Sequence, residues 1–285
     1  MVLDPPCEKK GAGISIVLYR PNITKLSKTL RHLRTAVSTG DKIMSLEETV
    51  LILVDNSVPS TDTTIIERLV REKYFGFEHP RHKVVLKSIG KNIGYGAAHN
   101  QAIWSHNYSY HLILNPDVYL YPDALATFLM YSETNRNVVM ITPMVLSPDR
   151  SVQYLLRRDP TLTDVTLRFL GIFLRFLTKL RRYQQYECRD IDMNKIQTGY
   201  VMSGCCMWCR TEALRVLGGF DERFFLYWED YDLSRRLRMI GQTVYLPHAR
   251  VIHDWDREMA KSFRLMLINI RSAIMFFRKW GWKIL

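Results

Sequence analysis

Two acidic segments have residue types and spacing that could do chemistry, because each follows a dense apolar run. Residues 112–114 lead into Asn115-Pro116-Asp117, and the aromatic-rich residues 224–228 lead into Glu229-Asp230-Tyr231-Asp232. A carboxylate at a strand end can bind a hard divalent cation that bridges two phosphates. A carboxylate beside aromatic rings suits the apolar face of a sugar and the deprotonation of its hydroxyl. We therefore predict a metal-held diphosphate next to a general base.

Both segments also have a purely structural explanation. Asp117 could cap the helix expected from Pro122, since Asx-Pro sequences form turns. Asp230 and Asp232 at a helix start would be stabilised by the helix dipole without any catalytic role. The aromatic residues in front of them favour the active-site interpretation, because a solvent-facing cap rarely carries so many. His253 ends an expected strand, where an imidazole can be a metal ligand or a core residue, and its own pattern leaves both open.

The elements that must position these residues alternate along the first half. Apolar or β-branched runs predict strands at 14–19, 50–55, 84–87, 110–114 and 138–141, with helices between them at 23–37, 64–72, 95–105 and 122–134. This alternation predicts βαβ units and a mostly parallel α/β sheet. Ligands of such sheets bind beyond the carboxyl ends of the strands. Three polar segments are expected together at that rim: Tyr19-Arg20, Asp55-Asn56-Ser57 and Asn115-Pro116-Asp117.

The glycine-containing segment 92–100 precedes one of the expected helices. Its glycines would permit close backbone approach to a phosphate, and the helix start offers free amide donors. The dinucleotide fingerprint fails, because His99 stands at the third glycine position. An ordinary strand-to-helix turn explains the segment equally well.

The second half has a different pattern. We expect a turn at 147–149, a basic helix at 161–183, a loop at 184–197, a strand at 201–209, a helix at 230–239, strands at 243–246 and 250–253, and a terminal helix at 261–280. This change of pattern divides the chain into a first half, 1–143, a second half, 144–260, and a C-terminal helix, 261–285.

The basic segment 161–183 places four cations on one side of the expected helix and apolar residues over much of the rest: Arg168, Arg175, Lys179 and Arg182. This composition favours a helix lying in a membrane surface, and a core helix with a solvated stripe is the alternative. The terminal residues 278–283, in which tryptophan stands beside lysine, support the membrane interpretation.

Composition limits the partners and the compartment. The net charge of +12 favours polyanions, but a nucleic-acid-binding protein would leave the ordered carboxylates unexplained. Five cysteines, an odd number, fit a reducing compartment, and we predict that Cys205, Cys206 and Cys209 are core thiols rather than zinc ligands. The sequence shows no secretory signal pattern and no uncharged apolar run of about 18 residues. A cytoplasmic location is expected.

Taken in order, these segments resemble the landmarks of family 2 glycosyltransferases, with the bacterial rhamnosyltransferase-like branch as the nearest likeness. The resemblance runs from about residue 14 to 257 and is carried by 14–20, 54–57, 92–100, 115–117, Ser203-Gly204, 218–222, 229–232 and 251–253. It implies the GT-A fold, in which a nucleotide-sugar-binding α/β half, here 1–143, merges with an acceptor-binding and catalytic half, here 144–260. It also implies transfer from a nucleotide sugar with inversion of the anomeric centre.

The resemblance also implies residue roles. The nucleotide sugar would be bound by Tyr19, Asp55, Asn56, Asn92, Gly94, Tyr95, Asn115, Asp117 and Arg257, with Arg257 or Lys261 near the leaving diphosphate. Asp117 and His253 would hold Mg²⁺ or Mn²⁺, and Asp230 would be the general base. Glu229 and Trp228 would touch the acceptor above Gly204. Two residues depart from the family pattern: Asn115 replaces the first acid of the Asp-x-Asp motif, and Arg20 replaces an asparagine.

The implied reaction moves L-rhamnose from dTDP-rhamnose, with a UDP-hexose donor as the alternative. The acceptor would be a hydroxyl of a lipid-linked bacterial surface glycan: an O-antigen, a capsule or a lipopolysaccharide core. The enzyme would then lie peripherally on the cytoplasmic face of the inner membrane, in contact with anionic lipid. A pyrophosphorylase is disfavoured, because residues 19–22 are not a glycine-rich basic loop.

Overall fold

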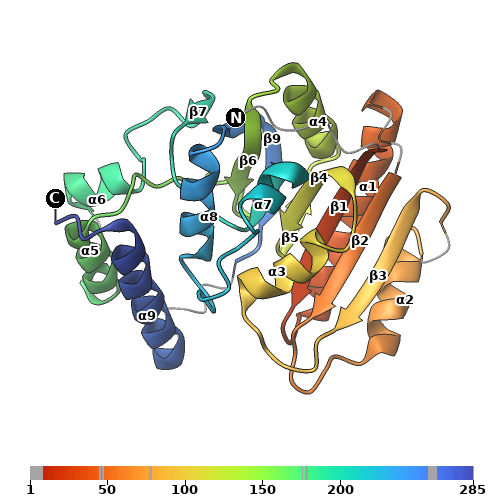
Figure 1. Cartoon of the computed structure of the whole chain (residues 1–285), viewed down its shortest axis with the longest axis horizontal. Coiled ribbons are helices and arrows are strands. Elements are labelled where there is room, and N and C mark those ends of the chain that lie inside the picture. Colours follow the sequence, from red (N-terminus) through yellow and green to blue (C-terminus); the bar gives the residue numbers. More distant parts are fainter. Residues whose placement is uncertain are drawn as a thin grey trace.

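A mixed β-sheet with helices on both faces forms the frame of the protein (Figure 1). The computed structural model describes residues 9–44, 46, 48–76, 79–174, 176, 179–255 and 262–284. The elements of the first half are β1 (Lys9–Leu18), α1 (Ile23–Met44), β2 (Glu48–Asp55), α2 (Thr63–Lys73), β3 (His82–Ser88), α3 (Tyr95–Ile103), β4 (Tyr108–Leu114), β5 (Val118–Leu120), α4 (Ala124–Thr134) and β6 (Val138–Leu146). Those of the second half are α5 (Leu162–Phe173), α6 (Arg181–Tyr186), β7 (Gln197–Thr198), β8 (Cys206–Arg210), α7 (Thr211–Val216), α8 (Glu229–Arg238), β9 (Gln242–His253) and α9 (Phe263–Trp280).

The strand order explains where the polar strand ends lie. The main path of the sheet runs β3-β2-β1-β4-β8-β6-β9-β5, and β7 pairs with β9. The four strands from β3 to β4 pair in parallel, so their carboxyl ends share one rim. Strand β8 of the second half then pairs antiparallel with both β4 and β6. The predicted α/β architecture is confirmed, and one sheet continues through both halves of the chain.

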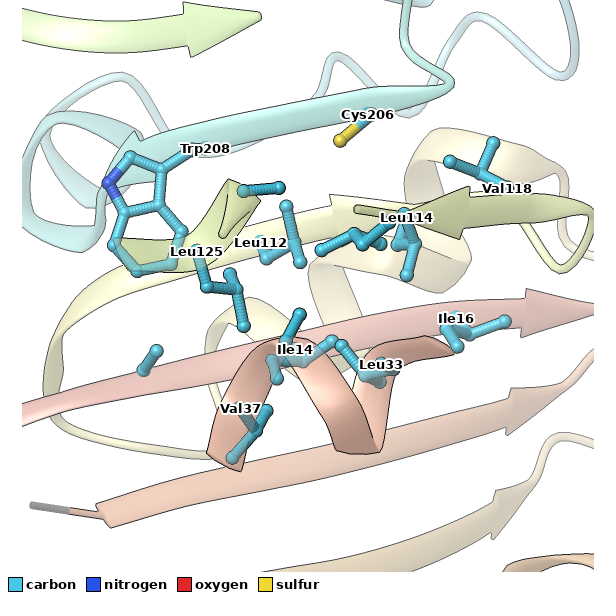
Figure 2. Close-up of a cluster of buried hydrophobic side chains, with 14 of the residues drawn as sticks. Ile14, Ile16, Leu33, Val37, Leu112, Leu114, Val118, Leu125, Cys206 and Trp208 are labelled. Atoms are coloured by element: carbon cyan, nitrogen blue, oxygen red, sulfur yellow. The ribbon is translucent and has the colours of Figure 1, made fainter. Parts of the chain in front are cut away.

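The core lies on both faces of this sheet. On one face α1, α2 and α4 cover β1 and β4, and on the other α3, α7 and α8 cover the reverse side. Figure 2 shows Leu33 and Val37 of α1 in the same buried cluster as Ile14 of β1, Leu112 of β4 and Trp208 of β8. Such fully buried aliphatic and aromatic contacts hold the strands in register, which fixes the positions of the polar groups at their ends.

A buried chain of hydrogen bonds joins α3 to β1 and β4. The Tyr108 N–H donates to His106 Nδ1 at 3.2 Å, so His106 Nε2 carries the hydrogen shared with His111 Nδ1 at 2.7 Å. His111 Nε2 then donates to Ser15 Oγ at 2.8 Å, and that hydroxyl donates to His99 Nδ1 at 2.7 Å. Burial lowers the pKa of His99 to about 3 and that of His106 to about 4. The imidazoles are therefore neutral and orient the helix that follows the glycine-containing segment.

The predicted basic helix at 161–183 is wrong as a single element. α5 ends at Phe173 and α6 spans Arg181–Tyr186, so the loop predicted from residue 184 begins only after Tyr186. Two of the four cations face the protein: Arg168 donates to the Tyr231 hydroxyl at 3.2 Å, and Arg182 pairs with Asp164 at 3.0 Å. Arg175 lies outside the described residues. Tyr231 belongs to α8, whereas Asp164 lies in α5, so the Arg182 ion pair joins the two parts of the divided segment.

Two strand predictions also need correction. The segments 243–246 and 250–253 form one strand, β9, because β6 shifts register between Pro143 and Met144 and keeps pairing with it. The strand predicted at 201–209 begins only at Cys206. Cys205, Cys206 and Cys209 are buried and free of disulfides, as the core-thiol prediction requires.

At one end of the molecule α5, α6 and α9 gather, opposite the end formed by β3 and α2 (Figure 1). Val165 of α5 packs with Ala273, Phe276 and Phe277 of α9 in a separate apolar cluster. Among the described residues, no helix combines the length and the hydropathy that crossing a membrane would require.

Candidate active site

Helix α8 begins at a strained turn that aims its first carboxylates. Tyr227 and Trp228 both have left-handed backbone, with φ of 66° and 70°. Consecutive non-glycine residues in this region are uncommon and cost free energy, so the surrounding structure must hold them. The Trp228 indole N–H donates to Asn269 Oδ1 of α9 at 2.8 Å, and the ring packs against Phe276. The turn thereby fixes the direction in which α8 starts.

Asp230 is held from both sides by backbone amides. The N–H of Gly204 donates to Asp230 Oδ2 at 2.9 Å, and the N–H of Tyr231 donates to Oδ1 at 2.9 Å. A Cβ on Gly204 would stand 3.2 Å from the Asp230 Cβ, which is a tight contact. The structure thus brings Gly204 and Asp230, both predicted site residues, into direct contact.

Tyr95, the first residue of α3, joins this carboxylate to the end of β4. Its hydroxyl lies 2.8 Å from both Asn115 Oδ1 and the Gly204 carbonyl oxygen. Burial raises the pKa of Tyr95 well above 10, and the negative charges of Glu229, Asp230 and Asp117 act in the same direction. The tyrosine therefore remains a hydrogen-bond donor at the point where these acidic groups converge.

The two neighbouring carboxyl groups of α8 have different surroundings. Glu229 is 5% exposed, and its Oε2 has no hydrogen-bond partner within the described structure. Burial and the charge of Asp230 raise the pKa of Glu229 well above 4.5. Burial also raises the pKa of Asp230, but the N–H groups of Gly204 and Tyr231 oppose that shift. Asp230 is therefore the carboxyl group whose charged form the backbone supports.

Asp117 and His253 meet because β5 and β9 pair antiparallel. The register places Val118 opposite His253, so Asp117 lies beside the imidazole. His253 Nε2 and Asp117 Oδ1 are 3.5 Å apart, and both atoms are buried without a hydrogen bond to any described residue. Burial lowers the pKa of His253, but Cys205 and Asp117 outweigh it and raise the pKa to about 10. Unsatisfied oxygen and nitrogen atoms that attract positive charge fit a divalent cation.

The cation ligands present are few. Within the described residues, no group of three or more His, Cys, Asp or Glu side chains has the arrangement of a metal site. Asn115, at the first position of the acidic motif, uses its Oδ1 to accept from Tyr95. Among the described residues, Asp117 and His253 are therefore the candidate ligands of an ion at this position.

The remaining donor-site candidates lie at the ends of β1 and β2. Asp55 is 2% exposed, and its carboxylate accepts hydrogen bonds from the Ser57 N–H and from the N–H and hydroxyl of Thr61. Its oxygens thus shape the loop after β2. Tyr19, in contrast, is 49% exposed at the rim.

The Asn56 side chain fixes the glycine-containing segment. Its amide donates to Asn92 Oδ1 at 2.9 Å and to the Gly94 carbonyl at 3.1 Å, and its Oδ1 accepts from Ile93. Gly94 has φ of 95°, and a Cβ there would stand 2.4 Å from the Phe225 carbonyl oxygen. This glycine therefore permits close approach of two protein loops.

The predicted contact of Trp228 with the acceptor is wrong, and two other predicted residues lie outside the described part of the chain. Trp228 is 2% exposed and points into the cluster with α9, so it does not form the aromatic wall expected beside the acceptor. The left-handed turn, which no sequence pattern signals, is the reason. Arg257 and Lys261 lie outside the described residues. Asn269, which accepts the Trp228 indole N–H, was not predicted, because its only signal in the sequence is a polar side chain among apolar residues of α9.

Comparisons with known proteins agree on one family. A sequence model described as "Glycosyltransferase like family 2" matches residues 22–271. An N-acetylglucosaminyl-diphospho-decaprenol L-rhamnosyltransferase of Mycobacterium tuberculosis is 31% identical over 185 residues, covering 60% of this chain and 58% of that protein. Rhamnosyltransferase WbbL of Escherichia coli is 30% identical over 162 residues, covering 54% and 57%. The chain thus spans less than two thirds of the length of these relatives.

Solved structures share the fold. Mannosyltransferase PcManGT from Pyrobaculum calidifontis, in complex with GDP-Man and Mn²⁺, has a TM-score of 0.58 at 13% identity, covering 96% of this chain and 67% of that one. S. aureus TarS 1–349 has a TM-score of 0.55 at 15% identity, covering 94% and 73%. These likenesses confirm the predicted GT-A architecture. With the family match over residues 22–271, they show that this chain belongs to glycosyltransferase family 2.

Proposed function

We propose that this protein transfers L-rhamnose from dTDP-L-rhamnose to a hydroxyl of a lipid-linked bacterial glycan, with inversion at the anomeric carbon. The observation that carries the proposal is the convergence of Asp230, Tyr95 and Asn115 through Gly204, next to the Asp117–His253 pair. The names of the relatives support the sugar, since two proteins at 30% and 31% identity are rhamnosyltransferases.

Asp230 would act as the general base. An inverting transfer needs an acceptor hydroxyl that loses its proton as it attacks the anomeric carbon opposite the leaving diphosphate. Two backbone N–H groups hold both oxygens of Asp230 and favour its charged form. Glu229 keeps its proton to a higher pH than an exposed glutamate, because it is buried beside Asp230. While Glu229 is protonated, Asp230 has no second negative charge beside it.

Asp117 and His253 would hold Mg²⁺ or Mn²⁺ against the diphosphate of the donor. When bound, such a cation offsets the charge that develops on the departing nucleoside diphosphate. The Asp117 Oδ1 and His253 Nε2 atoms support this assignment, because both are buried without a hydrogen bond to any described residue. Tyr95 would position Asn115, and through it the turn that carries Asp117.

Asn56, Asn92 and Tyr19 would form the nucleotide side of the donor site. The Asn56–Asn92 hydrogen bond ties the end of β2 to the start of α3, and the exposed Tyr19 stands at the same rim. Asp55 would contribute by shaping the loop after β2, because its oxygens already accept three hydrogen bonds. A UDP-hexose donor is the alternative that this arrangement leaves open.

A donor and product panel tests the proposal. The full chain is incubated with Mn²⁺, an N-acetylglucosaminyl-diphospho-polyprenol acceptor and either dTDP-L-rhamnose or UDP-hexoses, and products are read by mass. We expect dTDP and an acceptor heavier by one deoxyhexose. Transfer only from a UDP-hexose would replace the donor assignment. Nucleoside triphosphate formed on addition of diphosphate would indicate a pyrophosphorylase, and no thermal stabilisation by any nucleotide sugar would overturn the donor site.

A further inference from the structure

The outward side of α9 carries two adjacent stripes of opposite character. Successive residues of a helix are turned by about 100°, which places six residues of α9 within one arc of about 100° around its axis. In order around the helix these are Phe263, Ile274, Leu267, Arg278, Arg271 and Arg264. All six are exposed, and the exposed fractions of Phe263, Leu267 and Ile274 are 71%, 50% and 40%. We call these six residues the interfacial face. An apolar stripe of this size on a solvent-facing helix is unfavourable unless a partner covers it.

The charge on this face is of one sign. α9 contains no Asp or Glu, and none of the three arginines forms an ion pair with a described carboxylate. The whole chain has a formal charge of +12. A partner that covers the apolar stripe must therefore also offer negative charge along the length of the helix, as the headgroup layer of an anionic membrane does.

Further exposed apolar residues surround this end of the molecule. The C-terminal segment after α9 is tied to α5, because the Leu162 N–H donates to the Lys283 carbonyl at 2.8 Å. Trp282 and Ile284 of that segment are 52% and 68% exposed. Leu170, Leu174, Phe176 and Leu180, which lie in and after α5, are exposed by 42% to 63%. Tryptophan and aliphatic residues at a basic surface are typical of a membrane interface.

The inward side of α9 is attached to the catalytic segment. Asn269 accepts from the Trp228 indole, and the Ser272 hydroxyl donates to the Leu226 carbonyl at 2.9 Å. At the C-terminal end, the Trp280 indole donates to Asp232 Oδ1 at 2.9 Å. The helix thus holds both the turn before α8 and its first residues, so whatever surface α9 rests on is placed at a fixed distance from Asp230.

We propose that the interfacial face of α9 docks on the surface of an anionic lipid bilayer. The apolar stripe would enter the boundary between headgroups and acyl chains, and Arg264, Arg271 and Arg278 would contact lipid phosphates. This role moves from the segment 161–183, two of whose cations bind protein groups, to α9. A lipid-linked acceptor would then present its glycan to α8 from the same membrane.

Vesicle binding of the full chain tests the proposal without any substrate. We expect co-sedimentation with vesicles of phosphatidylglycerol and phosphatidylethanolamine, weak binding to phosphatidylcholine vesicles, and binding that falls as salt rises. The triple variant Arg264→Glu, Arg271→Glu, Arg278→Glu should lose at least about 10-fold in affinity. The double variant Leu267→Ser, Ile274→Ser should lose about 10-fold with no change in charge.

A matched control separates position from charge. Arg31→Glu, Lys42→Glu and Arg68→Glu alter three exposed cations of α1 and α2 by the same formal charge, and this variant should keep most of the binding. Equal loss in both triple variants, or no binding of the unaltered chain, would overturn the proposal. So would a dimer in vesicle-free sedimentation that the α9 variants abolish, because a second copy would then cover the face.

The outcome is independent of the transferase assignment. With a water-soluble, short-chain acceptor, the α9 triple variant should turn over at the rate of the unaltered chain. Vesicle binding without any transfer would support the docking surface and contradict the proposed reaction. Transfer without vesicle binding would support the reaction and contradict the docking surface.

Discussion

The backbone N–H of Gly204, just before β8, donates a hydrogen bond to Asp230 Oδ2 at the start of α8, with a distance of 2.9 Å. There is little space beside Gly204, because a Cβ at this position would stand 3.2 Å from the Asp230 Cβ. The orientation of the proposed base therefore depends on a residue that has no side chain.

Replacing Gly204 by alanine should move Asp230 without unfolding the protein. Because a displacement of about 1 Å in a reacting group can cost up to 100-fold, we expect turnover to fall about 10- to 100-fold. The melting temperature should change little. Gly40→Ala in α1 is the control, since its added methyl meets only ordinary contacts at 3.7 Å and beyond. A Gly204→Ala variant with unchanged turnover would show that this contact does not set the geometry.

Asp230→Asn should separate binding from chemistry. The amide cannot accept the acceptor's proton, so turnover should fall by about 10²- to 10⁴-fold, whereas the dissociation constant for the nucleotide sugar stays within a few-fold. Calorimetry with the donor and single-turnover kinetics measure the two quantities. If Glu229→Gln abolishes transfer while Asp230→Asn retains it, the two carboxyl groups have been assigned in the wrong order.

Loss of either member of the Asp117–His253 pair should weaken cation binding. In Asp117→Asn and in His253→Ala, we expect the Mn²⁺ concentration needed for thermal stabilisation by dTDP to rise at least about 10-fold. This measurement of thermal stabilisation does not depend on enzymatic turnover. Asp123→Asn, at an exposed aspartate before α4, serves as the control and should leave the Mn²⁺ requirement unchanged. Unaltered Mn²⁺ dependence in both site variants would remove the ion from this position.

The buried histidine chain should make the fold sensitive to acid. Because burial lowers the pKa of His99 to about 3 and of His106 to about 4, the unfolded chain binds more protons than the native one below its own pKa of 6.5. The contribution of these imidazoles to the free energy of unfolding is therefore fully present above pH 6.5 and falls as the pH drops. At pH 5 the loss is about 2 kcal/mol for a fully buried imidazole.

Denaturant titrations at pH 7 and pH 5 measure this loss. His106→Gln keeps a side-chain N–H for His111 but does not titrate, so the difference between the two pH values should shrink by about 1 to 2 kcal/mol. His248→Gln, at an exposed histidine, should leave the difference unchanged. The same pH dependence in both variants would contradict the neutral, buried state of the chain.

Much of the first half could be predicted because its signals are local. Each strand from β1 to β4 is an apolar run before a turn, and parallel pairing alone then brings Asp55 and Asn115 to one rim. Very short elements escaped prediction: β5, with three residues, exists because β9 pairs with it, and α7, with six, packs against β4. Segments of this length have no periodicity to detect.

The site was predicted less well where orientation depends on distant partners. The Asp117–His253 pair was expected only from the family resemblance, because the two residues are far apart in sequence and the β5–β9 register brings them to 3.5 Å. Trp228 stands beside the acidic residues in the sequence, yet its left-handed backbone turns the ring toward Asn269. Residue types indicated which segments carry the polar groups of the site, whereas side-chain direction followed from backbone geometry that composition does not encode.

The insertion of β8 between β4 and β6 has a consequence for synthesis on the ribosome. The order of the sheet leaves the open side of β4 without its neighbour until residues 206–210 have emerged. Until then the nascent chain presents an apolar strand edge, the kind of surface that chaperones protect and that otherwise recruits other unfinished chains. Completion of the sheet around β4 is thus coupled to translation of the part of the chain that precedes Asp230.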